Sequence, residues 1–387
     1  MENLKRIFRD NIRQYSMLIA LIVIMIFFQV LTDGTLMKPL NLTNLVLQNS
    51  YVVIMALGML LVIVAGHIDL SVGSVAAITG AIAAVLIVTF KVNLGLAIVI
   101  CLMVGAAIGA LQGFCIAYIK IPSFIVTLAG MLIFRGLTLV LLQGQSIGPF
   151  PSAFQALSSG FMPDIIPNFI GAHTTTLLVG VLLSAVLIFL DLRARQNQQK
   201  YKFEVVPFPF LVAKSVAVTA VIMGLCFLLA SYNGLPNVLL ILIALIAFYT
   251  FITTQTVIGR RIYALGGNQK AAKLSGVNTE RLTFYTFVNM GVLAAFAGLI
   301  ITARLNSATA KAGTGFELDA IAASFIGGAS ATGGIGTVIG GVIGAFIMGV
   351  LNNGMSIVGV GIDWQQAIKG SVLLLAVFFD VYNKNKS

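Results

Sequence analysis

The sequence predicts an all-α fold, a polytopic transmembrane helical bundle with about ten spans plus broken or re-entrant half-helices. Apolar residues make up 59% of the 387 residues and charged residues only 9%, whereas about a quarter of a soluble domain is charged. The apolar runs are continuous rather than alternating, and they reach the roughly 20 residues that a helix needs to cross the hydrocarbon core. The net charge of +11 is concentrated in short connections, so it indicates membrane topology and not a nucleic-acid partner.

Eleven apolar segments mark the expected crossings, and the glycine-rich tenth segment is long enough to hold two pieces, which gives about ten to twelve crossings. The first follows a basic N-terminus and is expected to be a retained span, because it is long for a signal-peptide core and no convincing cleavage site follows it. The segments are 17–32, 45–66, 70–89, 94–119, 122–142, 169–190, 211–231, 237–254, 283–304, 319–353 and 366–382.

Basic residues predict the orientation, because lysine and arginine are enriched in cytoplasmic connections. All four basic clusters are expected on the cytoplasmic side, and so are both termini; an even number of crossings separates neighbouring clusters if 319–353 crosses twice. The 143–168 connection contains four prolines but no lysine or arginine, so it is expected on the outer face. The basic clusters are Lys5, Arg6, Arg9 and Arg13, the connections 191–204 and 255–282, and the tail residues Lys384 and Lys386.

Two regions interrupt the plain helical pattern. GHIDLSVGS at 66–74 places Asp69 between two apolar runs, and the 313–341 stretch places Glu317 and Asp319 before a glycine cluster. Aligning Asp69 with Asp319 suggests an internal duplication, as in many transporters. The cluster lacks the lysine of a phosphate-binding loop and the GxGxxG spacing, so it is expected to provide close helix packing and a break in the helix.

Several polar residues lie within apolar runs, where a charge costs about 2.5–3.5 kcal/mol. Arg135 needs a partner, for which Asp69 is the candidate, and it either lines a pathway or braces the bundle. Asn352 and Asn353 either bond a passing solute or cap a helix before Gly354. The candidate residues of a translocation path are Asp69, Arg135, Glu317, Asp319 and Asn353.

The sequence contains no recognisable catalytic or metal-binding pattern. His67 and His173 are far apart and have no HExxH spacing, no serine lies in GxSxG, and no carboxylate pair is framed for acid and base catalysis. We therefore expect neither an enzyme nor a bound metal or cofactor.

The 255–282 connection contains NQKAAKLSG, a run of good helix formers that Asn268 can cap and Gly276 can close. A short helix outside the bilayer with small residues at Ala271, Ala272 and Ser275 is suited to dock on another protein. An ordinary polar connector is the equally weighted alternative.

Five motifs together resemble the sugar permeases of the ribose, xylose and galactose group of ATP-binding-cassette importers, most closely the xylose and multiple-monosaccharide permeases. The resemblance covers nearly the whole chain. It implies one transmembrane permease domain over 1–387 in a bacterial cytoplasmic (inner) membrane. The motifs are IDLSVGS (68–74), KIPSFIVTLAGMLIFRGL (120–137), GRRIYALGGNQKAAKLSGVN (259–278), ELDAIAASFIGGAS (317–330) and NNGMS (352–356).

The same resemblance implies the partners. The segment within 255–282 would couple to a separate cytoplasmic ATPase subunit that holds the ATP sites, and a soluble extracytoplasmic binding protein would deliver a monosaccharide, xylose or a related pentose or hexose, to a permease homodimer in the lipid bilayer. Transport would be inward by alternating access. The coupling residues implied by the motif are Gly267, Asn268, Ala271, Ala272, Ser275 and Gly276.

Two other functions stay open at this point. An ion-coupled secondary sugar transporter would use carboxylates at membrane depth, for which Asp69 and Asp319 are candidates. A membrane scaffold without a path would show no response to a solute.

Overall fold

The computed structural model describes residues 12–165, 172–201, 205 and 207–384. Within these ranges the chain forms helices and no strand, which confirms the predicted all-α class. Nine of the described helices are long and apolar enough to cross a membrane, and α2 adds a shorter apolar stretch, Ser16–Leu31. Lys5, Arg6, Arg9 and Lys386, which belong to the predicted terminal clusters, lie outside the described residues.

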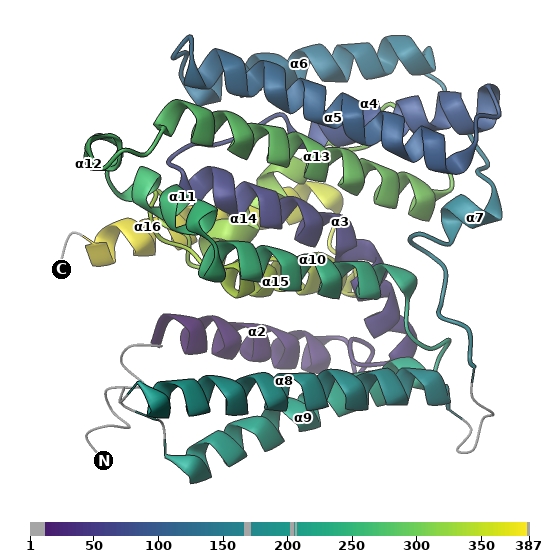
Figure 1. Cartoon of the computed structure of the whole chain (residues 1–387). Helices are drawn as coiled ribbons and strands as arrows, with labels where there is room; N and C mark the ends of the chain where they lie inside the picture. The colour runs from purple at the N-terminus through teal and green to yellow at the C-terminus, as the bar shows by residue number, and fades with distance from the viewer. Residues whose placement is uncertain (1–11, 166–171, 202–204, 206, 385–387) are drawn as a thin grey trace. The chain divides into compact units, whose positions relative to one another are not determined.

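The helices follow one another closely along the chain (Figure 1). In order they are α2 (Ile12–Leu31), α3 (Pro39–Val64), α4 (Val72–Ala84) with the π-helical η1 (Val85–Thr89), α5 (Leu94–Ala117), α6 (Ser123–Leu142), α7 (Ser152–Gln155), α8 (Thr174–Lys200), α9 (Phe208–Ala230), α10 (Asn237–Gln255), α11 (Val257–Gly267), α12 (Gln269–Leu274), α13 (Thr279–Leu305), α14 (Phe316–Ile326), α15 (Val338–Val358) and α16 (Ile362–Lys384).

Both interruptions predicted from the sequence are present. α3 ends at Val64 and α4 begins at Val72, and the loop 327–337 separates α14 from α15. The tenth apolar segment is therefore two pieces, and α14, with 11 residues, is about 16 Å long, half the thickness of the hydrocarbon core. Gly328, Gly333 and Gly334 have positive φ, a backbone conformation that favours glycine.

One predicted connection is wrong in part. Residues 191–200 do not form a loop but continue α8 to Lys200. This stretch is rich in arginine and glutamine, which are good helix formers, so the helix continues after the apolar run has ended. The apolar pattern marks where a span leaves the hydrocarbon and not where its helix ends.

The chain divides into two compact units. Unit 1 comprises residues 1–36, 45–159 and 238–387, and unit 2 comprises residues 37–44 and 160–237. In unit 2, α8 and α9 pack against each other. Asp164 accepts hydrogen bonds from the backbone N–H groups of Thr174 and Thr175, at the start of α8.

Glycines bring the helices of unit 1 together. α13 packs along α4 and α5, which lie beside it in Figure 1. A Cβ at Gly291 of α13 would lie 2.2 Å from the carbonyl oxygen of Gly105 in α5. α14 packs along α15 in the same way, because a Cβ at Gly344 would lie 1.9 Å from the carbonyl oxygen of Ala323. The packing role predicted for the glycine cluster is thus confirmed.

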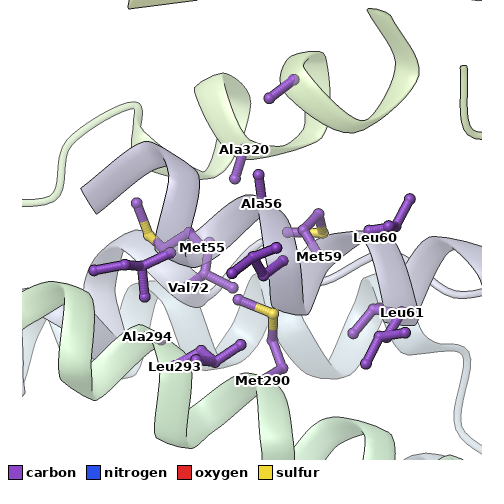
Figure 2. Packing of buried hydrophobic residues seen from close by; sticks show 14 of the residues in the cluster. Met55, Ala56, Met59, Leu60, Leu61, Val72, Met290, Leu293, Ala294 and Ala320 are labelled. Carbon is purple, nitrogen blue, oxygen red and sulfur yellow. The ribbon is translucent and has the colours of Figure 1, made fainter. Parts of the chain in front are cut away.

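The centre of unit 1 is the second half of α3. Figure 2 shows Met290 and Leu293 of α13 on one side of α3, which carries Met59, and Ala320 of α14 on the opposite side. All of these side chains are buried. α3 is therefore enclosed by helices that follow it much later in the sequence.

One end of unit 1 gathers segments that are far apart in the sequence. The backbone N–H of Gly334 donates to the carbonyl at the end of α3, and Asp380 near the end of α16 accepts from Ser330. Met17 near the start of α2 packs against Ile343 near the start of α15. The first described helix and the last one thus have their terminal ends at the same end of unit 1, which we call the α12 end because α11 and α12 also lie there.

Candidate functional site

The short helix predicted from NQKAAKLSG is present as α12. Asn268 lies between α11 and α12, and its Oδ1 accepts a hydrogen bond of 3.0 Å from the backbone N–H of Ala271. Gly276 follows the helix with a φ of +82°. The predicted asparagine cap and glycine closure are both confirmed.

The exposed surface of α12 differs from the predicted small-residue face. Ala271 and Ser275 are exposed, but Ala272 is only 5% exposed and packs toward the bundle. Leu274 is 91% exposed, although it is the largest apolar side chain of the helix. A partner that docks on α12 would therefore meet Ala271, Leu274 and Ser275 directly, and Ala272 would act by holding the helix in place.

α12 is tied to the start of α13. Lys273 Nζ lies 2.7 Å from Glu280 Oε1, and Asn278 Oδ1 accepts from the backbone N–H of Arg281 to cap α13. These contacts fix the position of α12 relative to a buried helix, so a force on one is transmitted to the other.

α11 is tied to the loop 327–337. The Tyr263 hydroxyl donates a hydrogen bond of 2.7 Å to the carbonyl of Gly336. A Cβ at Gly266 would lie 1.6 Å from the Val64 carbonyl oxygen and 2.6 Å from the Gly334 nitrogen, so only glycine fits there. α11 is therefore in contact with both the end of α3 and the loop that follows α14.

A cavity of about 550 Å³ opens beside α12. Lys120, Lys270 and Lys273 are among its lining residues, and Glu280 is the one carboxylate there. Burial lowers the pKa of the His67 imidazole, which lies in the connection between α3 and α4 and also lines the cavity. The neutral imidazole leaves the lysines to make this surface basic.

The two acidic residues of α14 each pair with a base from another helix. Glu317 Oε1 lies 3.9 Å from Arg135 Nη2 of α6, and Asp319 Oδ1 lies 3.0 Å from Lys369 Nζ of α16. Both carboxylates are buried. Such pairs hold a short helix in position, because separating either one would leave a charge uncompensated at membrane depth.

The partner predicted for Arg135 is wrong. Asp69 accepts hydrogen bonds from the backbone N–H of Ser71 at 2.8 Å and from its hydroxyl at 2.7 Å, so its carboxylate is used just before α4. The two aligned acids do not occupy equivalent positions, because Asp69 precedes its helix whereas Asp319 lies inside the first turn of α14. The suggested duplication stays a prediction.

The capping interpretation of Asn352 and Asn353 is wrong as well. α15 continues through both residues to Val358 and ends at Gly359, whose φ is +83°. Asn353 is buried, while Asn352 is half-buried and its Oδ1 has no hydrogen-bond partner among the described residues.

A second cavity, of about 330 Å³, lies between four helices of unit 1. The rings of Tyr51 and Phe316 stack along its wall, with centroids 4.0 Å apart and planes 28° apart. The cavity is lined by Gln48, Asn49 and Tyr51 of α3, Ile301 and Arg304 of α13, Phe316 of α14, and Gly349 and Asn352 of α15.

Residues 41–377, nearly the whole of both units, match the family described as the permease component of branched-chain amino acid transport systems. The chain belongs to this permease family. It is thus a transport-system permease subunit and a multi-pass membrane protein.

Similar curated proteins span the length of this permease. It is 39% identical to the xylose transport system permease protein XylH of Escherichia coli K12, over 97% of this chain and 94% of the relative. It is 40% identical to XylH of Haemophilus influenzae Rd, over 97% and 98% of the two chains. The ribose import permease protein RbsC of Escherichia coli K12 is 37% identical over 88% and 85%. No solved structure matches the chain significantly.

None of the five candidate path residues lines the 330 Å³ cavity of the permease. Asp69 accepts hydrogen bonds from Ser71, Arg135 pairs with Glu317, and Asp319 pairs with Lys369. Asn353 is buried next to Asn352 in α15. Their roles in permeation stay predictions.

Asn352 is the one residue of that cavity that the sequence singled out, as an amide that could bond a passing solute. Most of the others were missed because they lie in runs that the sequence assigns only as spans. A further available signal was QNSY at 48–51, four polar or semi-polar residues in succession inside the second apolar segment.

Proposed function

We propose that the chain is the membrane subunit of an ATP-binding-cassette importer that moves a monosaccharide inward by alternating access. The observation that carries this proposal is the solvent-facing α12, capped and tied to α13, in a chain of the permease family. A transporter that works without a partner has no need of such a helix. The permease contributes no catalysis of its own, and a separate cytoplasmic ATPase subunit hydrolyses ATP.

The proposed substrate follows from the relatives. Two of the relatives described above, the XylH proteins, are named for xylose transport. The third, RbsC, is named for ribose import. We assign this chain a pentose or related hexose, with xylose first. A soluble extracytoplasmic binding protein would deliver the sugar, and two copies of the permease would assemble as a homodimer.

Leu274 is the residue that we expect to anchor the ATPase. A leucine that is 91% exposed on a six-residue helix is accessible to a partner, and a few side chains buried at the centre of a protein interface dominate its affinity. Ala271 and Ser275 beside it are small and allow close approach. We assign Gly267, Asn268 and Gly276 to shaping the segment and Ala272 to seating it.

Movement at α12 has two physical routes into the bundle. One runs through the Lys273–Glu280 pair to α13, and the other through Tyr263 of α11 to Gly336 in the loop that follows α14. We propose that ATPase closure moves α11 and α12 together and shifts α14 by the second route.

The orientation follows from the same segment. If α12 meets a cytoplasmic ATPase, the α12 end of unit 1 faces the cytoplasm, and the start of α2 and the end of α16 lie on that side. We therefore propose cytoplasmic N- and C-termini in a bacterial inner membrane, with residues 1–387 acting as one permease domain.

The test is a matched pair of leucine and isoleucine substitutions. Leu274→Asp places a charge on the proposed anchor, and we expect capture of the ATPase subunit and ATP-dependent xylose uptake to fall by about tenfold or more. Ile362→Asp makes the same kind of change at an exposed residue, 73% exposed, at the start of α16, and should alter neither. Equal behaviour of the two variants at equal protein amount would refute docking through α12.

An ion-coupled carrier is separated by its energy source. The pairing of Glu317 with Arg135 and of Asp319 with Lys369 leaves these carboxylates with fixed partners, which does not favour ion coupling at α14. Membrane vesicles with the complete transport system should take up xylose with ATP present and a protonophore added. Uptake that stops with the protonophore while ATP is maintained would favour the ion-coupled carrier.

A further inference from the structure

We propose that the 330 Å³ cavity between α3, α13, α14 and α15 is a binding site for the monosaccharide during transport, with the amides of Gln48, Asn49 and Asn352 and the guanidinium of Arg304 as its polar contacts. The inference rests on the proposed function and adds the residues that would recognise the sugar.

The size of the cavity suits a small ligand. Small-molecule sites enclose about 300–1,000 Å³, and a cavity of about 330 Å³ lies at the lower limit of that range. A cavity of this size is large enough for a single sugar ring, whereas an oligosaccharide would not fit.

Its lining combines an aromatic wall with neutral polar groups. Tyr51 and Phe316 stack on each other, so their rings offer apolar edges and outer faces to the cavity, which can contact the C–H face of a sugar ring. Three amide side chains, each with two donor hydrogens and one acceptor oxygen, match hydroxyl groups, which also donate and accept. Few other ligand classes present both surfaces in so small a volume.

Asn352 supplies the clearest sign that a ligand is expected. Its Oδ1 is buried and has no hydrogen-bond partner in the described part of the chain. A buried acceptor without a donor costs free energy, and such groups are rare unless something else satisfies them. A sugar hydroxyl in the cavity would donate to this oxygen.

Asn49, which lines the cavity from α3, is held in place by α15. Its Nδ2 donates a hydrogen bond of 2.7 Å to the Ala345 carbonyl, which leaves its Oδ1 as an acceptor. A Cβ at Gly349 would lie 2.5 Å from Asn49 Cγ, so the amide occupies its position only because residue 349 has no side chain. The site is therefore pre-organised by α15.

Arg304 is the one charged residue in the lining, and no carboxylate lines the cavity. A guanidinium offers five donors to hydroxyl oxygens. The guanidinium could also donate hydrogen bonds to the carboxylate of an amino acid, and an amino acid is the ligand that the family description suggests. The aromatic wall and the three amides favour the neutral polyol, and the experiment below separates the two.

The position of the cavity connects it to the α12 end. Gln48 and Val64 are 16 residues apart on one helix, so the cavity lies roughly 24 Å from the end where α11 holds the loop 327–337. α14 spans much of that distance, with Phe316 in the cavity wall and Ile326 next to the loop. A shift of α14 would move Phe316 against Tyr51 and change the shape of the site.

The experiment measures uptake by the complete importer, with the ATPase and the binding protein, in proteoliposomes. Asn352→Ala removes the buried acceptor, and Gly349→Ala displaces Asn49; we expect each to lower ATP-driven xylose uptake by about tenfold while ATPase capture changes little. The unfolding temperature should change little for Asn352→Ala and fall for Gly349→Ala, because the added Cβ crowds the buried Asn49. Gly341→Ala is the matched control on α15, because the added Cβ would have no neighbour closer than 3.8 Å. This variant should transport xylose normally.

A second substitution guards against a packing effect at Asn352. Gln48→Ala alters a different wall of the cavity, and uptake should fall there too. Normal uptake by the Asn352, Gly349 and Gln48 variants, with wild-type transport intact, would overturn the cavity site and leave the proposed function standing.

Failure of the proposed function looks different. Wild-type importer that takes up no monosaccharide would refute the function itself, and wild-type uptake of leucine or valine that the cavity variants lose would show that Arg304 serves a carboxylate ligand.

Discussion

α3 and α9 are equally apolar but differ in what surrounds them. The most apolar stretches of the two helices have mean hydropathies of 2.1 and 2.2, yet 83% of that stretch is buried in α3 and 6% in α9. Hydropathy therefore reports that a helix enters a membrane, because both helices satisfy that condition. It does not report whether the helix faces other helices or the lipid.

The difference lies in small and polar residues rather than in apolar content. α3 contains Asn49, which bonds α15, and Gly58, at which a Cβ would lie 2.7 Å from Met290 Sδ. α9 contains Gly224, at which a Cβ would meet nothing within 4 Å. Polar and small side chains that find partners on neighbouring helices mark the buried span.

The largest expected effect comes from breaking one charge pair in each unit. Asp319→Asn leaves Lys369, 24% exposed, without its partner next to the buried helices of unit 1, and we expect it to cost about 3 kcal/mol of stability. Asp191→Asn breaks the Lys214–Asp191 pair of unit 2, whose side chains are 51% and 35% exposed, and should cost less than about 1 kcal/mol. Thermal unfolding in detergent measures both.

The double variant Asp319→Asn with Lys369→Met sharpens this result. It removes the charge that Asp319→Asn leaves unpaired, so much of the lost stability should return. Equal losses of unfolding temperature in Asp319→Asn and Asp191→Asn would contradict the structure, in which the Asp319–Lys369 pair is more deeply buried than the Asp191–Lys214 pair.

The spans and their breaks could be predicted because they depend on local patterns. The interruption at 66–74, the two pieces within 319–353 and the Asn268 cap each follow from residues that are neighbours in the sequence. The extension of α8 to Lys200 was missed because polar helix formers carry no apolar signal.

The candidate site was predicted less well, because its contacts join residues far apart in the sequence. Arg135 pairs with Glu317, 182 positions away, and not with Asp69, whose carboxylate is used by Ser71 two residues later. The cavity collects residues from four helices, and its wall depends on a glycine at 349. No property of any one segment identifies such a set.

An intermediate effect is expected from adding bulk to the two compared helices. Gly58→Leu forces four carbon atoms against Met290 and Leu293 of α13 and should cost about 1–3 kcal/mol. Gly224→Leu makes the same change where a Cβ meets nothing within 4 Å and should leave stability nearly unchanged. The amount of monodisperse protein and its unfolding temperature are the measurements, and similar losses for both variants would contradict the burial contrast.

The smallest effect is expected at the start of α8, where exposed polar contacts replace helix packing. Thr175, through its hydroxyl and backbone N–H, and Thr174 donate hydrogen bonds to Asp164, which lower the pKa of this carboxyl from its usual 3.8. A carboxyl whose pKa is lowered by folding stabilises the folded state above its unfolded pKa, and this contribution is lost as the pH falls through the folded pKa.

Asp164→Asn should therefore be slightly less stable than wild type at pH 7, and the difference should shrink only below about pH 3.8. Thermal unfolding of the two proteins across this pH range is the measurement, and a difference that stays constant from pH 7 to well below 3.8 would show that the charge of this carboxyl does not stabilise the start of α8.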